Sequence, residues 1–289
     1  MLPARFEYHR PETLDEALAL LDQYGDDAKV LAGGMSFIPL MKLRFASPGH
    51  VVDINRIPGL SGISEDGGWL RVGALARHNE IARSDLVKAR YPAMATAAPL
   101  ISDPLVRNLG TIGGSLAHAD PAGDWGSVVL AMGGQVVARS SAGERVVDID
   151  DLFQTTFLTT LQPNEVITEV RVPVAQARSG GTYLKLERKV GDFATVGVAV
   201  QLGLDDGRVA SAGIGLTSVG PRNIKATEAE ASLAGNEPNE AAFAEAARLA
   251  AAAARPVTDL RGSVDYKRNV VEVFVRRGLA RALEMARAG

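Results

Sequence analysis

Residues 32–44 read AGGMSFIPLMKLR, and a second stretch at residues 111–125 reads TIGGSLAHADPAGDW. Each stretch contains a pair of glycines that follows an apolar segment and precedes residues with helical character. Glycine has no Cβ atom, so backbone N–H groups in such a turn can approach a ligand closely. The N-terminus of a following helix also favours negative charge. The two stretches therefore indicate a pair of turns suited to a pyrophosphate group.

The same glycine pairs can make tight turns without binding anything, and either pair alone favours that simpler interpretation. Neither matches the G-x-G-x-x-G pattern of dinucleotide-binding Rossmann folds or the G-x-x-x-x-G-K-[ST] pattern of P-loops. Gly213 and Gly215 fail as well, because the next glycine, Gly220, lies at the wrong spacing. We therefore predict neither a Rossmann fold nor a P-loop.

Composition and charge place the chain among ordinary globular proteins. Its 289 residues exceed the usual single core, so two or three subdomains are expected. A net charge of −3 and the lack of a dense Lys/Arg cluster argue against nucleic acid as a partner. The N-terminal residues lack the apolar core of a signal peptide, and no run of about 18 apolar residues is available to span a membrane. We expect a cytoplasmic protein without a transmembrane segment.

The cysteine and histidine content limits the chemistry. With no cysteine, the chain forms no disulfide and holds no cysteine-bound zinc, iron–sulfur cluster or cysteinyl flavin. The four histidines are scattered, without an H-E-x-x-H pair. His118, Asp120 and Asp124 have the ligand types of a metal site, but their position directly after the second glycine turn explains their polarity. We predict no metal site.

The order of apolar patterns predicts an α+β chain in three parts. Residues 1–54 combine short strands with helices, and Thr13 followed by Glu16 is typical of a capping box at the start of the first helix. Residues 55–176 begin with strand and helix segments and continue mainly as strands. Residues 177–289 predict a three-stranded antiparallel sheet followed by three helices. These helices are expected near residues 226–234, 239–253 and 263–287.

The two glycine stretches, together with KLERKVGDFATVGVAV at residues 185–200, resemble the flavoproteins of the molybdenum hydroxylase family. Within that family, the chain is most similar to the medium subunits of aerobic carbon monoxide dehydrogenases. The resemblance covers essentially the whole chain. It implies an FAD-binding fold of the vanillyl-alcohol oxidase/xanthine dehydrogenase flavin-domain type, completed by the C-terminal sheet and helices. FAD would lie between the first two parts without a covalent bond, and the third part would extend to it.

The resemblance also implies which residues contact FAD. Asp124 would accept hydrogen bonds from the ribose or adenine end, whereas Asp120 matches the family less securely and is interpreted as a helix N-cap. Ile101 and Leu161 would lie near the flavin, although core packing explains both equally well. The two glycine turns would hold the diphosphate through Ala32, Gly33, Gly34, Met35, Ser36, Thr111, Gly113, Gly114 and Ser115.

Two further positions concern the flavin ring. The resemblance gives Lys185 a polar contact to the cofactor, where its cation would stabilise the anionic reduced flavin. The alternative is a solvated charge at a strand edge. Phe193 stands where the related medium subunits typically carry a tyrosine beside the ring. Stacking would survive this exchange but a hydroxyl hydrogen bond would not, so we expect the flavin site to differ there, unless Phe193 is a plain core aromatic.

The family resemblance implies a heterotrimer in which each subunit has a separate role. A molybdenum-bearing large subunit oxidises the substrate, a small subunit passes electrons through two [2Fe–2S] clusters, and FAD in this chain collects them for a quinone or another acceptor. The complex would be cytoplasmic, with a peripheral association with the inner membrane as an option. Two alternatives stay open: a free-standing flavin-dependent oxidoreductase of the same fold, and a non-catalytic module whose turns bind nothing. Carbon monoxide, purines, N-heterocycles and aldehydes all stay open as substrates of the complex.

Overall fold

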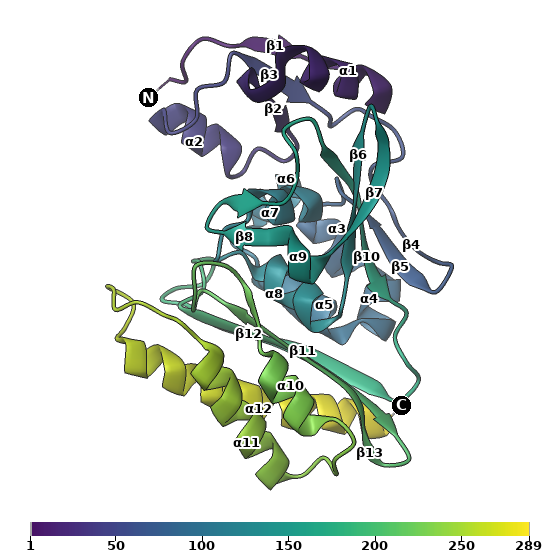
Figure 1. The fold of residues 1–289 in the computed structure, drawn as a ribbon, viewed down its shortest axis with the longest axis vertical. Helices are drawn as coiled ribbons and strands as arrows, with labels where there is room; N and C mark the ends of the chain where they lie inside the picture. Colours follow the sequence, from purple (N-terminus) through teal and green to yellow (C-terminus); the bar gives the residue numbers. More distant parts are fainter. Residues whose placement is uncertain (1, 289) are drawn as a thin grey trace.

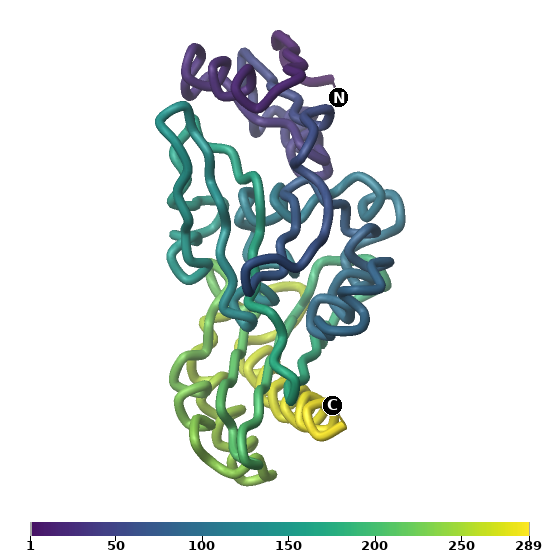
Figure 2. The backbone as a smooth tube through the Cα atoms, turned by 90° about the vertical axis from the view of Figure 1, so that its right-hand side faces the viewer, coloured from purple at the N-terminus to yellow at the C-terminus, as the bar shows by residue number. Residues whose placement is uncertain are grey.

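The computed structural model describes residues 2–288, which form three units stacked along the long axis of the molecule (Figure 1). The N-terminal unit lies at one end, the middle unit carries the largest sheet, and the C-terminal unit lies at the other end. Figure 2, turned by 90°, shows the same stacking order. The mixture of helices and mainly antiparallel sheets confirms the predicted α+β class. No helix within residues 2–288 is long and apolar enough to cross a lipid bilayer.

The N-terminal unit is a three-stranded parallel sheet, of order β1-β3-β2, with two α-helices. Its elements are β1 (Glu7–His9), α1 (Leu14–Tyr24), the short 3-10 helix η1 (Gly25–Asp27), β2 (Ala28–Leu31), α2 (Phe37–Leu43) and β3 (His50–Asp53). The predicted capping box is confirmed, because the Thr13 hydroxyl accepts from the N–H of Glu16 and the Glu16 carboxylate accepts from the N–H of Thr13. Helix α1 buries Ala17, Leu18 and Leu21 in the core of this unit.

The middle unit is built on a five-stranded antiparallel sheet of order β4-β5-β10-β6-β7. Its strands are β4 (Ile63–Asp66), β5 (Trp69–Gly73), β6 (Gln135–Ser140), β7 (Gly143–Asp148) and β10 (Val166–Pro173), with a small hairpin of β8 (Phe153–Thr155) and β9 (Leu158–Thr159). Its helices are α3 (His78–Arg83), α4 (Asp85–Arg90), α5 (Pro92–Ala97), η2 (Ala98–Leu100), α6 (Pro104–Leu109), α7 (Ile112–His118), α8 (Asp124–Ala131) and α9 (Ile149–Leu152). Helices α3 and α4 are separated at Ser84, because the Ser84 hydroxyl accepts from the N–H of Val87 and starts a new helix.

The C-terminal unit packs three helices on an antiparallel sheet of order β11-β12-β13-β14. Its strands are β11 (Ser179–Leu186), β12 (Val196–Asp205), β13 (Arg208–Thr217) and β14 (Ile224–Lys225), and its helices are α10 (Thr227–Leu233), α11 (Glu240–Ala253) and α12 (Val264–Ala288). The three predicted helices are confirmed. The predicted three-stranded sheet is wrong by one strand, since β14 pairs with Gly215 and Leu216 of β13. A strand of two residues is too short to show a periodic pattern in the sequence.

Two glycines set the contact between the middle and C-terminal units. A Cβ atom at Gly213 would lie 1.7 Å from the carbonyl oxygen of Ala131, and one at Gly215 would lie 2.0 Å from that of Ser127. Helix α8 therefore rests directly on the backbone of β13. This close approach explains the Gly-x-Gly pair that fits no nucleotide-binding motif.

Candidate functional site

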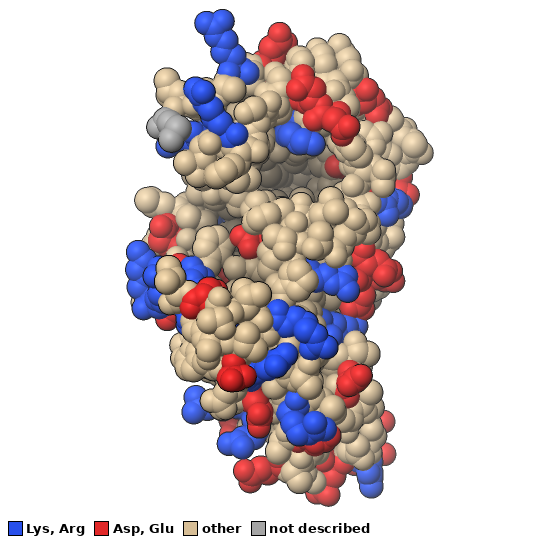
Figure 3. Space-filling view, turned by 60° about the vertical axis from the view of Figure 1, so that its left-hand side comes forward, with Lys and Arg blue, Asp and Glu red and all other residues tan. Residues whose placement is uncertain are grey.

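A cavity of about 710 Å³ lies between the N-terminal unit and the rest of the molecule. The space-filling view shows a hollow there with mostly uncharged walls (Figure 3). Its volume falls within the range of roughly 300–1,000 Å³ that is typical of cofactor and small-molecule sites. All the residues predicted to contact the cofactor line this cavity, namely Ala32, Gly33, Gly34, Met35, Ser36, Ile101, Thr111, Gly113, Gly114, Ser115, Asp124, Leu161, Lys185 and Phe193.

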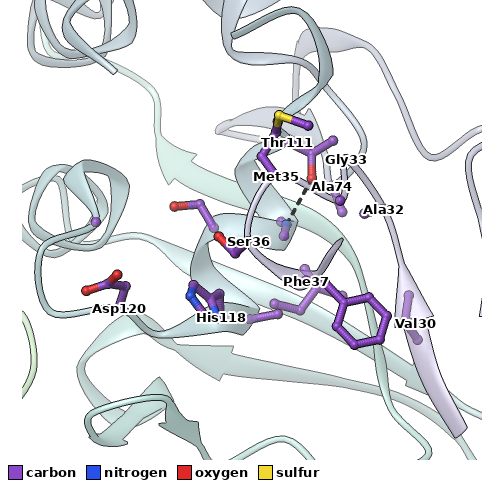
Figure 4. Close-up of a pocket in the computed structure, with 18 of the residues that line it drawn as sticks. Val30, Ala32, Gly33, Met35, Ser36, Phe37, Ala74, Thr111, His118 and Asp120 are labelled. Carbon is purple, nitrogen blue, oxygen red and sulfur yellow. Dashed lines mark hydrogen bonds between the residues drawn. The ribbon is translucent and has the colours of Figure 1, made fainter. Parts of the chain in front are cut away.

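The first glycine turn presents unpaired backbone donors to the cavity. Within residues 2–288, no protein acceptor is found for five successive N–H groups, those of Gly33, Gly34, Met35, Ser36 and Phe37. Figure 4 shows the side of the cavity that this turn forms, between β2 and α2. Gly34 is buried and Gly33, Met35 and Phe37 are half-buried, whereas Ser36 is exposed. Backbone N–H groups away from bulk water are nearly always paired, so free donors on these partly buried residues mark a place for an acceptor. A run that leads into a helix N-terminus suits an anion.

Ser36 stands at the N-cap position of α2, but its side chain makes no capping hydrogen bond. Its φ and ψ angles are −104° and −45°, whereas a capping residue usually has an extended conformation. The Ser36 hydroxyl is therefore available to a ligand. The helix ends at Leu43, because Arg44 adopts the left-handed conformation with a φ of 60°.

The second glycine pair belongs to the first turn of α7 and not to an open loop. Thr111 caps this helix, since its hydroxyl accepts from the N–H of Gly114 and its carbonyl oxygen accepts from the N–H of Ser115. The N–H of Gly113 bonds to the carbonyl oxygen of Ala74 (Figure 4). The backbone donors here are thus used within the protein, and the two turns are not equivalent as their sequences suggest. The Ser115 hydroxyl, which has no partner among the described residues, is what this turn offers a ligand.

Packing inside the protein accounts for most of the glycines themselves. A Cβ atom at Gly33 would lie 2.2 Å from the carbonyl oxygen of Leu109, and one at Gly113 would lie 2.5 Å from the Cβ of Ala74. Gly34 has a φ of 73°, which other residues rarely adopt. The simpler interpretation of tight, closely packed turns therefore explains why glycine stands at these positions. The indication of a ligand comes instead from the free N–H groups of the first turn.

Arg77 and Asn55 connect the two turns, although neither belongs to a recognisable motif. The Arg77 guanidinium donates to the carbonyl oxygen of Leu109 and, at 2.6 Å, to Oδ1 of Asn55. Nδ2 of Asn55 donates in turn to the carbonyl oxygen of Ala32 at 2.7 Å. Because Leu109 lies just before the second turn and Ala32 begins the first, these hydrogen bonds fix the spacing between the two turns. Neither residue can be recognised from local sequence, since their partners are distant along the chain.

Asp124 is buried at the start of α8, where both of its carboxylate oxygens have partners. The Tyr183 hydroxyl donates to Oδ1 at 2.5 Å, and Nζ of Lys185 donates to Oδ2 at 3.1 Å. Burial raises the pKa of Asp124, while the charge of Lys185 and the hydrogen bond from Tyr183 act against that rise. The carboxylate therefore holds Lys185 at the cavity wall, and any ribose or adenine contact would use its remaining lone pairs.

Lys185 is a buried charge and not a solvated one, because only 2% of its side chain is exposed. Besides Asp124, its Nζ donates to the carbonyl oxygen of Leu100 at 2.9 Å and lies 3.6 Å from the Glu187 carboxylate. The alternative of a solvated strand-edge lysine is therefore wrong. With two carboxylates around one ammonium group, the local formal charge is negative when both acids are ionised.

His78 also lines the cavity, although it belongs to no recognisable motif. It is buried, and Nε1 of Trp125 donates to its Nδ1 at 3.0 Å, which leaves the ring proton on Nε2. Desolvation, followed by repulsion from Arg77 and Arg107, lowers the pKa of His78 to about 4. This wall of the cavity is consequently uncharged at neutral pH.

The polar residues after the second turn also line the cavity. Oδ1 of Asp120 accepts from the N–H of Ala122 at 2.9 Å, while Gly123 is the N-cap of α8. The interpretation of Asp120 as a helix N-cap is therefore wrong. Within residues 2–288, the donor groups close enough to share a metal ion lie outside the cavity, at Glu7, His9 and His50.

Apolar side chains form the wall farther from the glycine turns. Ile101 is 9% exposed and belongs to the core of the middle unit, and Leu161 packs half-buried against the same core. Each residue therefore has both a packing role and a face toward the cavity. Phe193 is 54% exposed, so it is not a core aromatic. Free N–H groups, hydroxyls, an apolar wall and one buried cation together fit a ligand with a diphosphate and a flat, weakly polar ring.

Comparisons with known proteins agree with this geometry. Residues 4–175 match the family described as FAD binding domain in molybdopterin dehydrogenase, and residues 181–282 match the CO dehydrogenase flavoprotein C-terminal domain. The chain is 44% identical to the carbon monoxide dehydrogenase medium chain of Hydrogenophaga pseudoflava, over 96% of this chain and 97% of the relative. It is 38% identical to the 6-hydroxypseudooxynicotine dehydrogenase complex subunit alpha of Paenarthrobacter nicotinovorans, over 99% of this chain and 97% of the relative.

A solved structure shows the same fold over the whole chain. A chain of carbon monoxide dehydrogenase from Hydrogenophaga pseudoflava superimposes with a TM-score of 0.95 at 46% identity, covering 99% of both chains. This protein therefore belongs to the family of FAD-binding medium subunits of molybdenum hydroxylases, and it is an oxidoreductase subunit.

Proposed function

We propose that this chain is the FAD-binding electron-transfer subunit of a heterotrimeric molybdenum hydroxylase. It takes electrons from [2Fe–2S] clusters in a small subunit and passes them to a quinone or another acceptor. A large subunit with the molybdenum cofactor oxidises the substrate. The observation that carries the proposal is the run of free N–H groups from Gly33 to Phe37 at the cavity wall, in a chain of this family.

The diphosphate of non-covalently bound FAD is assigned to this run. The hydroxyls of Ser36 and Ser115 supply further donors to phosphate oxygens. The residues that line the cavity within the described part of the chain include no arginine. Backbone dipoles and hydroxyls, and not guanidinium groups, therefore meet the phosphate charge.

The flavin ring is assigned to the wall formed by Ile101, Leu161, Phe193 and Lys185. FAD supplies the redox chemistry, since it accepts electrons one at a time and releases a pair. The apolar side chains exclude water from the ring and orient it. The Lys185 ammonium group favours negative charge on the ring. The carboxylate of Asp124 holds that ammonium group in place and partly offsets its charge.

Two observations support an electron-transfer role over a substrate-binding one. None of the 289 residues is a cysteine, so the proposed [2Fe–2S] clusters belong to another subunit. Relatives at 44% and 38% identity come from enzymes named for carbon monoxide and for 6-hydroxypseudooxynicotine, two dissimilar substrates. That diversity is expected where the substrate is oxidised elsewhere in the complex. A peripheral position at the inner membrane, beside a quinone acceptor, completes the proposal.

Replacement of Ser36 by aspartate tests the diphosphate assignment. Aspartate is a good N-cap, so α2 should persist, whereas its carboxylate should repel a phosphate placed on the neighbouring N–H groups. The full-length wild-type chain should retain FAD through desalting, and Ser36→Asp should lose most of it. Ser47→Asp, at an exposed serine of the same unit outside the cavity, is the matched control and should retain FAD. Wild-type FAD content in folded Ser36→Asp would contradict the assignment.

Copurification from the native host tests the subunit role. A tagged chain should bring down two further polypeptides that together contain molybdenum and iron. A flavin-loaded monomer that oxidises a small molecule unaided would instead support the free-standing flavin oxidoreductase.

A further inference from the structure

The loop that contains Gly191, Asp192 and Phe193 connects β11 to β12 and forms one lip of the cavity. Gly191 has a φ of 87°, and it approaches the backbone of Ser102 beside the apolar wall. The ring of Phe193 is more than half exposed. Packing alone therefore holds this ring only in part, and its position depends on polar contacts of the loop backbone.

Arg261, from the segment between α11 and α12, supplies these contacts. Its Nη1 donates to the carbonyl oxygens of Phe193 and Ala194, both at 3.2 Å, and its Nη2 donates to Oδ1 of Asp192 at 3.1 Å. Nε of Arg188 donates to the other carboxylate oxygen of Asp192, also at 3.1 Å. The hydrogen bond from Arg188 lowers the pKa of Asp192, and the nearby Arg261 acts in the same direction. One guanidinium group thus binds three successive residues of the loop.

Arg261 is itself fixed by the start of α12. It lies in a tight turn in which Asp259 and Gly262 exchange two backbone hydrogen bonds of 3.2 Å. Lys267 of α12, whose side chain is 3% exposed, pairs with Asp259 at 2.7 Å and donates to the carbonyl oxygen of Val257 at 2.9 Å. In Figure 1 the segment that precedes α12 lies at the same end of the C-terminal sheet as the β11–β12 loop. The turn therefore holds Arg261 in a fixed position.

We propose that Arg261 is a positioning residue for the cofactor, which acts through Phe193. It holds the Asp192–Ala194 backbone so that the Phe193 ring closes the lip of the cavity over the bound ligand. This inference rests on the proposed FAD site. It adds a role for the C-terminal unit, which holds the cavity lip through the Arg261 side chain in the segment that precedes α12. Lysine cannot replace arginine here, because its single ammonium group does not present the planar fork that reaches two carbonyls and a carboxylate together.

A double-mutant cycle measures whether Arg261 acts through Phe193. The rate of FAD release is followed for the full-length wild type, Arg261→Gln, Phe193→Ala and the double variant, by the gain in flavin fluorescence after dilution. Arg261→Gln should release FAD about tenfold faster, as expected for the loss of hydrogen bonds from a charged group. Phe193→Ala should release it faster as well. In the Phe193→Ala background, Arg261→Gln should have almost no further effect, and Arg261→Lys should resemble Arg261→Gln.

The control is Arg248→Gln on α11, an exposed arginine whose ion pair is with Glu245 of the same helix. It should release FAD at the wild-type rate. If Arg261→Gln still raised the rate of FAD release tenfold in the Phe193→Ala background, the proposal would be overturned. Arg261 would then affect FAD release independently of Phe193. An unchanged rate in Arg261→Gln would overturn it too. A wild-type chain that binds no FAD would defeat the proposed function as well as this inference.

Discussion

Lys185 stands between two carboxylates at the cavity wall, and this arrangement predicts the effect of changing one of them. Asp124→Asn keeps an oxygen for the Tyr183 hydroxyl but removes the negative charge that lies 3.1 Å from Nζ of Lys185. The cation should then stabilise the anionic reduced flavin more strongly. The midpoint potential of bound FAD should rise by about 30 mV, which corresponds to about 1.4 kcal/mol for a two-electron couple.

Spectroelectrochemical titration of the FAD-loaded chain measures this potential. Asp150→Asn is the control, because Asp150 pairs with Lys225 outside the cavity and should leave the potential unchanged. A potential that falls or stays constant in Asp124→Asn would show that Lys185 does not act on the ring.

His78 is buried as a neutral ring, so its protonation competes with folding. Its pKa of about 4 lies below the ordinary value of 6.5. Its contribution to the free energy of unfolding is therefore fully present above the ordinary pKa and is lost as the pH falls toward the folded-state value. This loss amounts to about 3 kcal/mol at most.

His78→Gln removes this dependence while retaining an acceptor for the Trp125 N–H. Relative to the wild type, the variant should become more stable as the pH falls from neutral toward the pKa of His78. Urea denaturation at a series of pH values measures the difference. If the free energies of unfolding of the wild type and the variant changed equally with pH across this range, the prediction would be wrong.

Between elements, the hydrogen bonds from Arg77 to Leu109 and to Asn55 set the spacing of the two glycine turns. Arg77→Ala should weaken FAD binding about tenfold, because the free N–H groups of the first turn lose their fixed position. Arg77→Lys should not restore the affinity, since lysine cannot bind Leu109 and Asn55 with a planar fork. Calorimetric titration with FAD gives the affinities. Arg83→Ala, at the end of the same helix and outside the cavity, is the control and should bind FAD like the wild type. An Arg77→Ala variant with wild-type affinity for FAD would contradict this role of Arg77.

The contact of α8 with β13 predicts a large effect on stability. In Gly215→Ala, the new methyl group would meet the carbonyl oxygen of Ser127, and relief requires the helix to move off the sheet. The free energy of unfolding should fall by about 3 kcal/mol, at the upper end for overpacked cores. Chemical denaturation measures it, with the exposed Ser211→Ala of the same strand as control. A loss no larger than that of the control would show that the backbone contact is not tight.

Local patterns in the sequence predicted the elements that depend on neighbouring residues. The capping box at Thr13, the helices of the C-terminal unit and the positions of both glycine turns follow from such patterns. The difference between the turns does not, because two donors of the second turn, the N–H groups of Ile112 and Gly113, bond to Ala76 and Ala74, far back in the chain. The burial of Lys185 and the bridge through Arg77 are likewise long-range contacts. The family resemblance located the cavity residues, whereas only the structure distinguishes free donors from paired ones.

For the molecule as a whole, we propose units at residues 1–54, 55–176 and 177–289. Strand β3 ends at Asp53 and β10 ends at Pro173, and the family matches divide the chain between 175 and 181. Trypsin should cut first near the exposed Arg178 between the last two units. The fragments should elute together in size-exclusion chromatography, because α8 and β13 stay in contact. Separate elution would contradict a firm contact between these units.

A structure of the full-length chain with FAD bound tests the central claim most directly. We expect the diphosphate within hydrogen-bond distance of the N–H groups from Gly33 to Phe37 and of the Ser36 and Ser115 hydroxyls. We also expect the flavin ring beside Phe193 and Lys185. A diphosphate bound elsewhere, with the first turn still free of any acceptor, would contradict it.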